Sequence, residues 1–167
     1  MTMKEQHIAP ELYAILAQVS DPEIPVLSIM EMGVVRSAII GDNKRVTVQI
    51  TPTYSGCPAV DVIGDDIKSA LAAAGYSATV ELVLSPAWTT DWITETGRAA
   101  LKKYGIAAPL TPEADKDVLL HGKKLVPCPQ CKSTNTVLVS QFGSTACKAL
   151  FKCLDCEEPF DYFKCLK

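Results

Sequence analysis

The sequence has no long apolar run, and this shortage already excludes one class of protein. A helix that spans a bilayer needs about 20 consecutive apolar residues, and no stretch of the 167 residues approaches that length. The first seven residues also lack the apolar segment of a secretory signal. We therefore expect a cytoplasmic protein with no membrane partner.

Histidine is scarce as well, and the usual nucleotide-binding motifs are missing. The two histidines, His7 and His121, stand near the start and in a polar stretch. A Cys–His or Ser–His–Asp catalytic group is therefore disfavoured. The sequence contains no P-loop and no Gly-x-Gly-x-x-Gly motif. We predict that the chain is not itself a catalyst.

Basic charge is also in short supply. The formal net charge is −3: residues 1–121 carry 9 basic and 15 acidic side chains, and residues 122–167 carry 7 lysines, no arginine and 4 acids. A protein that binds nucleic acid is usually basic over its contact surface. The acidic balance and the scattered lysines therefore argue against a nucleic-acid partner.

The sequence is, by contrast, rich in apolar residues and in cysteines. It is 48% hydrophobic and 21% charged, a composition that favours a folded core over disorder. Cys57 is alone in the first 127 residues, whereas six cysteines lie in the last 40. In a reducing cytoplasm, this usage indicates metal or redox chemistry. The distribution predicts an apolar-cored domain followed by a small metal-held module.

Hydrophobic periodicity predicts the elements of the first part. Helices are expected at residues 10–19, 58–74 and 90–104. Strands are expected at residues 33–40, 45–51 and 78–84, the first two forming a hairpin. This order fits the α+β class, with residues 1–110 as a two-layer domain whose helices pack on a small mixed three-stranded sheet. Residues 111–121 lose the periodicity and are predicted to be a linker, followed by an all-β zinc ribbon over residues 122–167.

Two Cys-x-x-Cys pairs define the predicted ribbon. They are separated by 21 residues, close to the spacing of a four-cysteine zinc site, and the candidate ligands are Cys128, Cys131, Cys153 and Cys156. Strand-like runs at residues 136–140, 146–152 and 159–165 complete the module. Two unrelated redox pairs are the less favoured alternative. Iron or a cluster at the same thiolates stays open, because the spacing does not distinguish these metals from structural zinc.

Two further cysteines of the module lie outside these pairs. If the last two strands pair across the second Cys-x-x-Cys turn, Cys147 and Cys165 become neighbours. They are then either two small buried apolar residues or a second thiol site.

Cys57 directly precedes Pro58, at the predicted start of a helix. As the N-cap residue, its sulfur would lie at the positive end of the helix dipole, which lowers the pKa of a thiol. Such a thiol suits a nucleophile, a redox group or a soft-metal ligand, and a buried cysteine without function is the alternative. Further upstream, residues 21–25 (Asp-Pro-Glu-Ile-Pro) form either a rigid turn that carries two carboxylates or a simple helix stop and cap.

Several motifs carry a family resemblance. In the first part they are Asp21-Pro-Glu-Ile-Pro with Gly33-Val-Val, Thr51-Pro-Thr-Tyr-Ser-Gly-Cys57-Pro, and Trp88-Thr-Thr-Asp-Trp-Ile. Over about residues 8–110 the chain resembles the MIP family of cytosolic iron-sulfur assembly factors. With the ribbon, which includes Phe142-Gly-Ser-Thr-Ala-Cys147 and Pro159-Phe-Asp-Tyr-Phe-Lys-Cys165, the whole chain resembles the bacterial PaaD family of phenylacetate degradation.

The resemblance implies an accessory subunit of the phenylacetyl-CoA epoxidase, a ring mono-oxygenase. In that system a di-iron oxygenase subunit works with a reductase that holds flavin and a [2Fe-2S] cluster. The implied role is to assist cluster assembly in the reductase or metal maturation of the oxygenase, alongside the general iron-sulfur assembly machinery. The alternative is a stoichiometric structural adaptor that acts by contact. Whether the chain forms a homodimer stays open.

The same resemblance assigns candidate residues. Cys57 is the candidate thiol that reacts with, or contacts, a transient iron-sulfur cluster. The candidate supporting residues are Asp21, Glu23, Thr53, Cys147 and Cys165.

Overall fold

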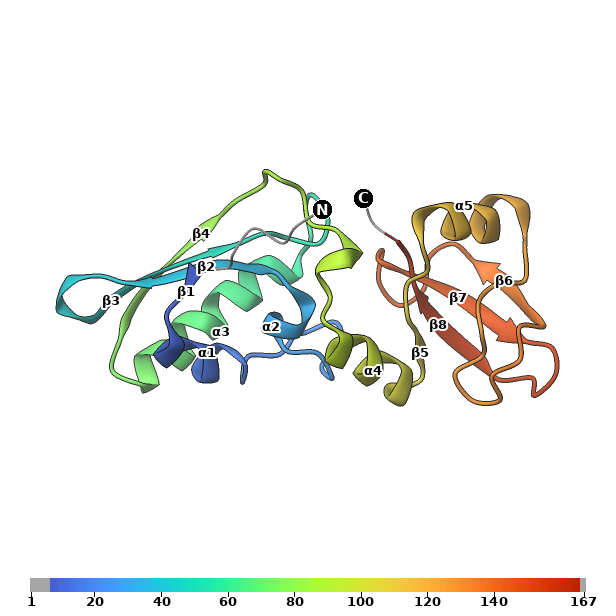
Figure 1. Ribbon diagram of the computed structural model, residues 1–167, viewed down its shortest axis with the longest axis horizontal. Coiled ribbons are helices and arrows are strands. Elements are labelled where there is room, and N and C mark those ends of the chain that lie inside the picture. The colour runs from blue at the N-terminus through green and yellow to red at the C-terminus, as the bar shows by residue number, and fades with distance from the viewer. Residues whose placement is uncertain (1–6, 166–167) are drawn as a thin grey trace. The chain divides into compact units, whose positions relative to one another are not determined.

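The computed structural model describes residues 7–165, and the chain divides into two compact units after Gly97 (Figure 1). Each unit is built around its own sheet. Among the described helices, none combines the length and the apolar character that crossing a membrane requires.

The sheet of the first unit has four strands in the order β1-β2-β3-β4. Strands β2 (Val35–Ile40) and β3 (Arg45–Ile50) form the predicted hairpin around a 3₁₀ turn at Asp42–Lys44, and β4 (Ser77–Leu82) runs parallel to β3. The expectation of three strands is wrong by one, because β1 (His7–Ile8) adds to the edge parallel to β2. Two residues are too few to show the alternation by which a strand is recognised.

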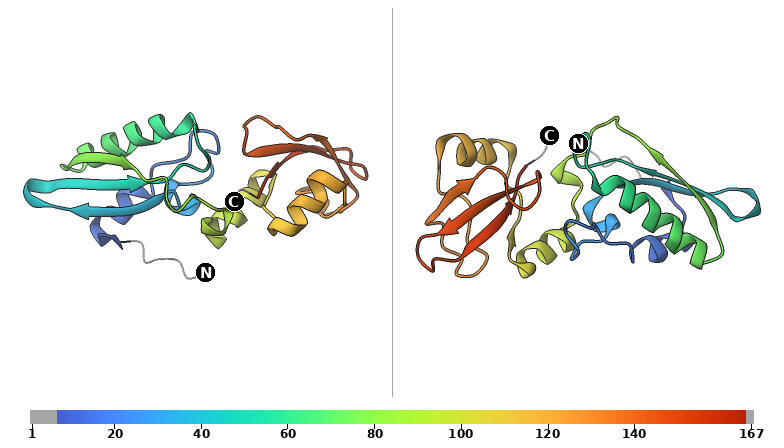
Figure 2. Two further views of the ribbon diagram at one scale, coloured as in Figure 1. Left: turned by 90° about the horizontal axis from the view of Figure 1, so that it is seen from above. Right: turned by 180° about the vertical axis from the view of Figure 1, so that it is seen from behind.

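Three helices accompany this sheet: α1 (Pro10–Leu16), α2 (Ile29–Met32) and α3 (Ala59–Ala73). Helix α3 lies along one face of the sheet (Figure 2). Every second residue of β3 is buried, and so is one stripe of α3, as the two periodicities predict. The core formed in this way includes Val46, Val48, Ile50, Ile63, Ile67 and Leu71.

The segment after β4 is fixed to the start of β2. The indole Nε1 of buried Trp88 donates a hydrogen bond to the carbonyl oxygen of Met32 at 3.0 Å. Gly33 has a φ of +73°, and a Cβ atom there would lie 2.4 Å from the carbonyl oxygen of Trp92. Only glycine satisfies both the backbone conformation and the close approach.

The helix predicted for residues 90–104 is divided in the structure. A 3₁₀ turn at Thr90–Trp92 comes first, and α4 (Glu95–Tyr104) follows. The hydroxyl of Thr94 accepts a hydrogen bond from the backbone N–H of Gly97 at 3.0 Å, which is the arrangement of a helix N-cap. Thr94 therefore starts a new helix instead of continuing the turn before it.

The second unit contains a four-stranded sheet in the order β5-β8-β7-β6. Strands β6 (Thr136–Ser140), β7 (Lys148–Cys153) and β8 (Pro159–Phe163) are antiparallel and confirm the three strands predicted for the ribbon. Strand β5 (Ile106–Ala107) joins the edge in parallel with β8, so the sheet is mixed.

The predicted linker at residues 111–121 is wrong, and so is the expectation of an all-β module. Residues Pro112–His121 form a helix, α5, which begins at an N-cap hydroxyl on Thr111 and ends at Gly122 in the left-handed conformation. The helix escaped detection because one of its two buried residues is a carboxylate, Asp115, with Val118 as the other. A charged residue at a core position breaks the apolar stripe on which recognition depends.

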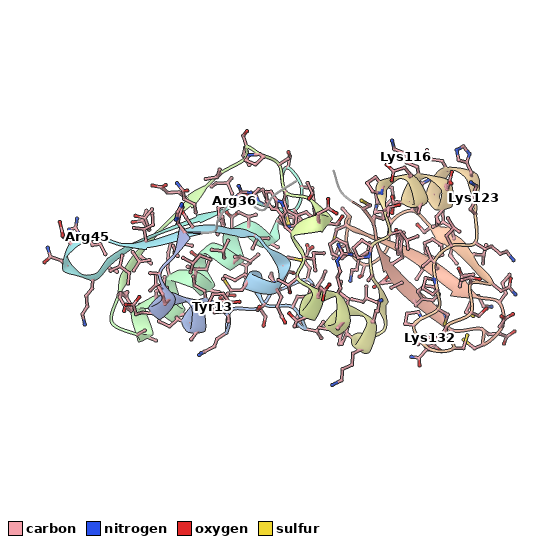
Figure 3. All side chains as sticks on the ribbon, viewed as in Figure 1. Tyr13, Arg36, Arg45, Lys116, Lys123 and Lys132 are labelled. Atoms are coloured by element: carbon pink, nitrogen blue, oxygen red, sulfur yellow. The ribbon has the colours of Figure 1, made fainter. Side chains whose placement is uncertain are left out.

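Asp115 is buried because it accepts hydrogen bonds from the second unit's last strand. Its Oδ1 accepts from the Tyr162 hydroxyl at 2.6 Å and from the backbone N–H of Cys165 at 3.0 Å. Tyr162 is itself fully buried in the apolar core of this unit, which also contains Phe151 and Val118. The next residue of α5, Lys116, lies on the outer side of the helix (Figure 3). Helix α5 is thus an integral part of the module.

We expect Asp115→Ala to lower the free energy of unfolding of the second unit by about 3 kcal/mol, because a buried phenol and a backbone N–H lose a charged acceptor. Amide NMR of the full-length chain in a denaturant series measures this loss. Both tryptophans lie in the first unit, so their fluorescence midpoint should stay unchanged. Glu113→Ala, which removes an exposed acid of the same helix, is the control. Equal losses in the two variants would contradict the role of Asp115.

Candidate metal centre and thiol site

The four predicted ligands of the ribbon converge. The Sγ atoms of Cys128 and Cys156 are 3.7 Å apart, those of Cys131 and Cys153 are 3.5 Å apart, and all four lie within 4.8 Å of one another. A tetrahedral Zn²⁺ site with Zn–S bonds of about 2.3 Å has sulfur–sulfur distances of about 3.8 Å. The four thiols therefore fit a tetrahedral metal ion, and thiolate ligands suit zinc or iron.

The two Cys-x-x-Cys turns have the same backbone geometry. In each, the N–H of the first cysteine donates to the carbonyl oxygen five residues later: Cys128 to Ser133 at 2.8 Å and Cys153 to Glu158 at 2.9 Å. In each, the residue after the second cysteine has a positive φ, +65° at Lys132 (labelled in Figure 3) and +63° at Glu157. The site is therefore built from two equivalent knuckles.

A carboxylate links the two knuckles directly. Asp155 of the second knuckle accepts hydrogen bonds from the Ser133 hydroxyl and, at 2.7 Å, from the Asn135 side-chain amide of the first. These two donors hold the pKa of Asp155 below its usual range. The N–H of Leu154 also donates to the carbonyl oxygen of Asn135 at 2.8 Å. The protein thus holds the ligand pairs together with polar contacts that do not involve the metal.

Backbone amides also favour the ionised form of one ligand. The N–H of Cys156, assisted by that of Asp155, lowers the pKa of Cys153 to about 7. A metal ligand must be a thiolate. These backbone amides therefore favour the thiolate form that a metal ion at this cluster requires.

Cys147 and Cys165 are close in the sheet but are not direct cross-strand partners. The register pairs Lys148 with Phe163, and the N–H of Lys164 donates to the carbonyl oxygen of Cys147 at 3.0 Å. Cys147 is therefore opposite Lys164, one residue from the predicted pairing. Its sulfur lies 3.0 Å from the Thr145 hydroxyl, and no disulfide joins any of the seven cysteines, all of which are described. A second thiol site stays a prediction.

Cys57 lies at the start of α3, in a loop that folds back on itself. Its N–H donates to the carbonyl oxygen of Tyr54 at 3.2 Å, and its sulfur is 4.0 Å from the Thr53 hydroxyl. The N-cap of α3 is Pro58, so Cys57 stands one residue before the capping position and not at it, where the sequence had predicted it. The side chain is half-buried.

The expected activation of Cys57 by the helix is not found. Burial raises the pKa of the Cys57 thiol, and the nearby Glu23 carboxylate raises it further. The Ala59 N–H and the Thr53 and Tyr54 side chains act in the opposite direction without outweighing burial. The position of Cys57 near a helix N-terminus did not predict the direction of its pKa shift, because that argument omits the loss of solvent around the sulfur.

The two predicted carboxylates have different surroundings. Asp21 is buried, and its Oδ1 accepts from the backbone N–H groups of Glu23 and Ile24 at 2.8 and 2.9 Å. It therefore holds the turn in shape. Glu23, which this turn carries, is the charged residue whose field reaches Cys57.

Thr51 is a residue that the sequence did not single out. It follows the alternating strand β3, where its position would place it on the exposed side, yet it is only 1% exposed. It lines a small cavity together with Asp21 and Cys57. No periodic signal could have revealed this, because the alternation ends at Ile50 with the strand.

Comparison with known families agrees with the division of the chain. Residues 10–82 match the family described as "Iron-sulfur cluster assembly protein", and residues 112–164 match the "PaaD zinc beta ribbon domain", whose match begins at the first residue of α5. The protein is therefore of the class that joins an iron-sulfur assembly domain to a zinc ribbon.

The relatives identify the family more closely. A protein of Escherichia coli (strain K12), described as a putative subunit of 1,2-phenylacetyl-CoA epoxidase, is 46% identical over 157 residues, which cover 93% of this chain and 92% of that protein. The chain belongs to this PaaD-type family.

Shorter proteins resemble part of the chain. The "Fe-S protein maturation auxiliary factor YitW" of Bacillus subtilis (strain 168) is 30% identical over 99 residues, which cover 58% of this chain and 96% of that protein. A crystal structure of a "Domain of Unknown Function DUF59" from Bacillus anthracis superposes with a TM-score of 0.51 at 29% identity, covering 55% of this chain and 88% of that one.

Cys153→Ala should abolish metal binding and unfold the second unit. The free energy of binding at a structural thiolate site is on the order of 10 kcal/mol, which exceeds the stability of a module this small. Elemental analysis and amide NMR of the full-length chain report metal content and fold together. Cys165→Ala, which removes a thiol outside the four-cysteine cluster, should retain both. Retention of metal by Cys153→Ala would contradict this assignment.

Glu23→Gln should make Cys57 more reactive. Removal of the carboxylate's charge lowers the pKa of Cys57, so at any pH below that pKa the thiolate fraction rises, by about threefold for half a pH unit. Iodoacetamide labelling, followed by mass spectrometry of the Cys57 peptide across a pH series, measures the change. Glu11→Gln, an exposed acid on α1, should leave the profile as it is. A slower reaction in Glu23→Gln would reverse the sign and refute this account.

Proposed function

We propose that this protein is an accessory subunit of a phenylacetyl-CoA epoxidase and assists maturation of its metal-containing components. The client would be the reductase, which receives an iron-sulfur cluster, or the oxygenase subunit, which receives iron. The observation that carries the proposal is Cys57, the sole cysteine of the unit that matches the iron-sulfur assembly family, at the start of α3. The protein itself would catalyse no ring oxidation.

The surroundings of Cys57 favour transfer over storage. Within residues 7–165, the four cysteines of the ribbon are the one group of three or more His, Cys, Asp or Glu side chains that converges as a metal site does. Cys57 would therefore supply a single protein ligand to iron or to a cluster. The remaining ligands would come from a donor or client protein, and such a shared arrangement releases its cargo readily.

The ribbon would have a structural task. We infer that its ion is zinc, because residues 112–164 match the PaaD zinc beta ribbon domain. The role is structural, because four thiolates close the coordination sphere and leave no position for a substrate. The buried Cys128 and Cys153 join this site to the apolar core of the second unit. Zinc would thus fix a surface through which the chain contacts its client, in the cytoplasm, where thiols stay reduced.

A second candidate function is that of a stoichiometric adaptor in the epoxidase complex. The raised pKa of Cys57 favours this alternative, because a protonated thiol is a poor metal ligand. An adaptor would act by contact, and its removal from an assembled, metal-loaded complex would stop turnover.

Coexpression of the reductase with wild-type protein or with Cys57→Ser separates these functions. If Cys57 carries the cargo, reductase made with Cys57→Ser should contain iron and acid-labile sulfide only at the level found without this chain. Ser55→Ala, an exposed substitution in the same loop, should support full loading. Full loading with Cys57→Ser, together with loss of turnover when the chain is withdrawn from the finished complex, would replace the maturation function by the adaptor function.

A further inference from the structure

Next to Cys57 the first unit contains a small, partly open cavity of about 10 Å³. Ile50, the last residue of β3, lines it together with the three residues that follow, 51–53. Helix α3 contributes apolar side chains. Asp21, at the turn that carries Glu23, also lines the cavity. The lining residues include Val34, Ile50, Thr51, Cys57, Val60 and Ile63. Cys57 therefore lines this small cavity and is also partly exposed to solvent.

The polar group that distinguishes this cavity is the Thr51 hydroxyl. Thr51 is 1% exposed, and its Oγ1 has no hydrogen-bond partner among the residues that the structure describes. It is the one buried side-chain oxygen or nitrogen of residues 7–165 in that condition. Its backbone is well satisfied, since the N–H donates to the carbonyl oxygen of Val34 at 2.8 Å. A buried hydroxyl without a partner is costly, and native proteins rarely retain one without a use.

The size of the cavity limits what the hydroxyl can bind. A volume of about 10 Å³ holds one water-sized atom and no more. A water or a ligand atom in that position would lie among Thr51, Asp21 and Cys57, which provides the polar partners that a buried water needs. Thr53 also lines the cavity, and its hydroxyl already lies 4.0 Å from the Cys57 sulfur. The remaining lining residues are apolar, so the polar contacts of such an atom would be directed to these four residues.

We propose that Thr51 is a positioning residue of the Cys57 site. Through one water molecule in the cavity, its hydroxyl acts on the Cys57 sulfur: the Thr51 hydroxyl donates to the water oxygen, and the water donates to the sulfur and stabilises the thiolate. This inference rests on the proposed function of Cys57 and explains how a half-buried thiol can still ionise when its cargo arrives.

The groups around the sulfur agree with a need for such a donor. The charged groups that face Cys57 are carboxylates from the turn at residues 21–25: Glu23 opposes ionisation, and Asp21 lines the cavity. The loop itself provides the Thr53 and Tyr54 hydroxyls, and α3 provides the N–H of Ala59. Val34, the residue before β2, and Val60 and Ile63 of α3 contribute only apolar side chains to the cavity. Among the hydroxyls that line the cavity, that of Thr51 is the one left without a hydrogen-bond partner within the described residues, so it is available to a water next to the sulfur.

The test compares Thr51→Val, which keeps the shape and removes the hydroxyl, with Thr51→Ser, which keeps the hydroxyl. The matched control is Thr47→Val, the same change at an exposed position of β3. The measured quantity is the rate of Cys57 alkylation by iodoacetamide against pH, in the full-length, metal-loaded protein, from the mass of the Cys57 peptide. Tryptophan fluorescence checks that the first unit stays folded. Thr51→Ala replaces Thr51→Val if the valine variant does not fold.

We expect the midpoint of the pH profile to rise by about one pH unit in Thr51→Val, with a rate near neutral pH about tenfold lower. Thr51→Ser and Thr47→Val should both follow the wild-type profile. An unchanged profile in Thr51→Val overturns the proposal. So does an equal rise in Thr51→Ser, because the hydroxyl would then not be the cause.

The test of Thr51 and the test of the proposed function can fail separately. If Thr51→Val reacts like wild type while Cys57→Ser still fails to load the reductase, the role of Thr51 fails and the maturation function stands. If Cys57→Ser loads the reductase fully, the maturation function fails, whatever the pH profile of Thr51→Val shows.

Discussion

The convergence of four sulfur atoms is the constraint on which the second unit depends. Cys128 and Cys153 each belong to two groups at once: they are members of the tetrahedral cluster and of the buried apolar core. The core therefore cannot be packed without bringing the ligands together, and the ligands cannot be held without the core. Because the module is small, hydrophobic burial alone would leave it marginally stable. A metal ion held by the four thiols would therefore stabilise the fold of the whole unit.

The first unit is stabilised differently, and its chemistry follows from that difference. Its apolar core between sheet and α3 needs no metal, so its single cysteine is available for other use. That cysteine lies where two physical effects oppose each other. The amide of Ala59 at the start of the helix favours a thiolate, whereas burial and Glu23 favour the neutral thiol. The net effect raises the pKa of the Cys57 thiol, so the neutral form is favoured until its surroundings change.

Sequence reasoning succeeded where a signal was repeated and failed where it was brief. The spacing of the two Cys-x-x-Cys pairs predicted the cluster, because two tight turns leave the thiols few other positions. The alternation in β3 and the stripe of α3 predicted the layers of the first unit. Strand β1 was missed because two residues show no period, and α5 because Asp115 interrupts its apolar face. The burial of Thr51 depends on the cavity between separate elements, and no local pattern encodes it.

The hydrogen bonds of Asp115 bear on how this protein can be divided. Tyr162 receives its acceptor from α5, and its hydroxyl oxygen also accepts from the N–H of Leu110 at 3.3 Å. A fragment beginning at residue 122 would contain all four cysteines of the cluster but would lack α5. The buried Tyr162 hydroxyl would then have lost its acceptor, the Asp115 carboxylate. The smallest fragment that can fold alone is therefore determined by the hydrogen bonds of Tyr162 as much as by the metal site. Because β5 (Ile106–Ala107) pairs with β8, this unit extends upstream at least to Ile106.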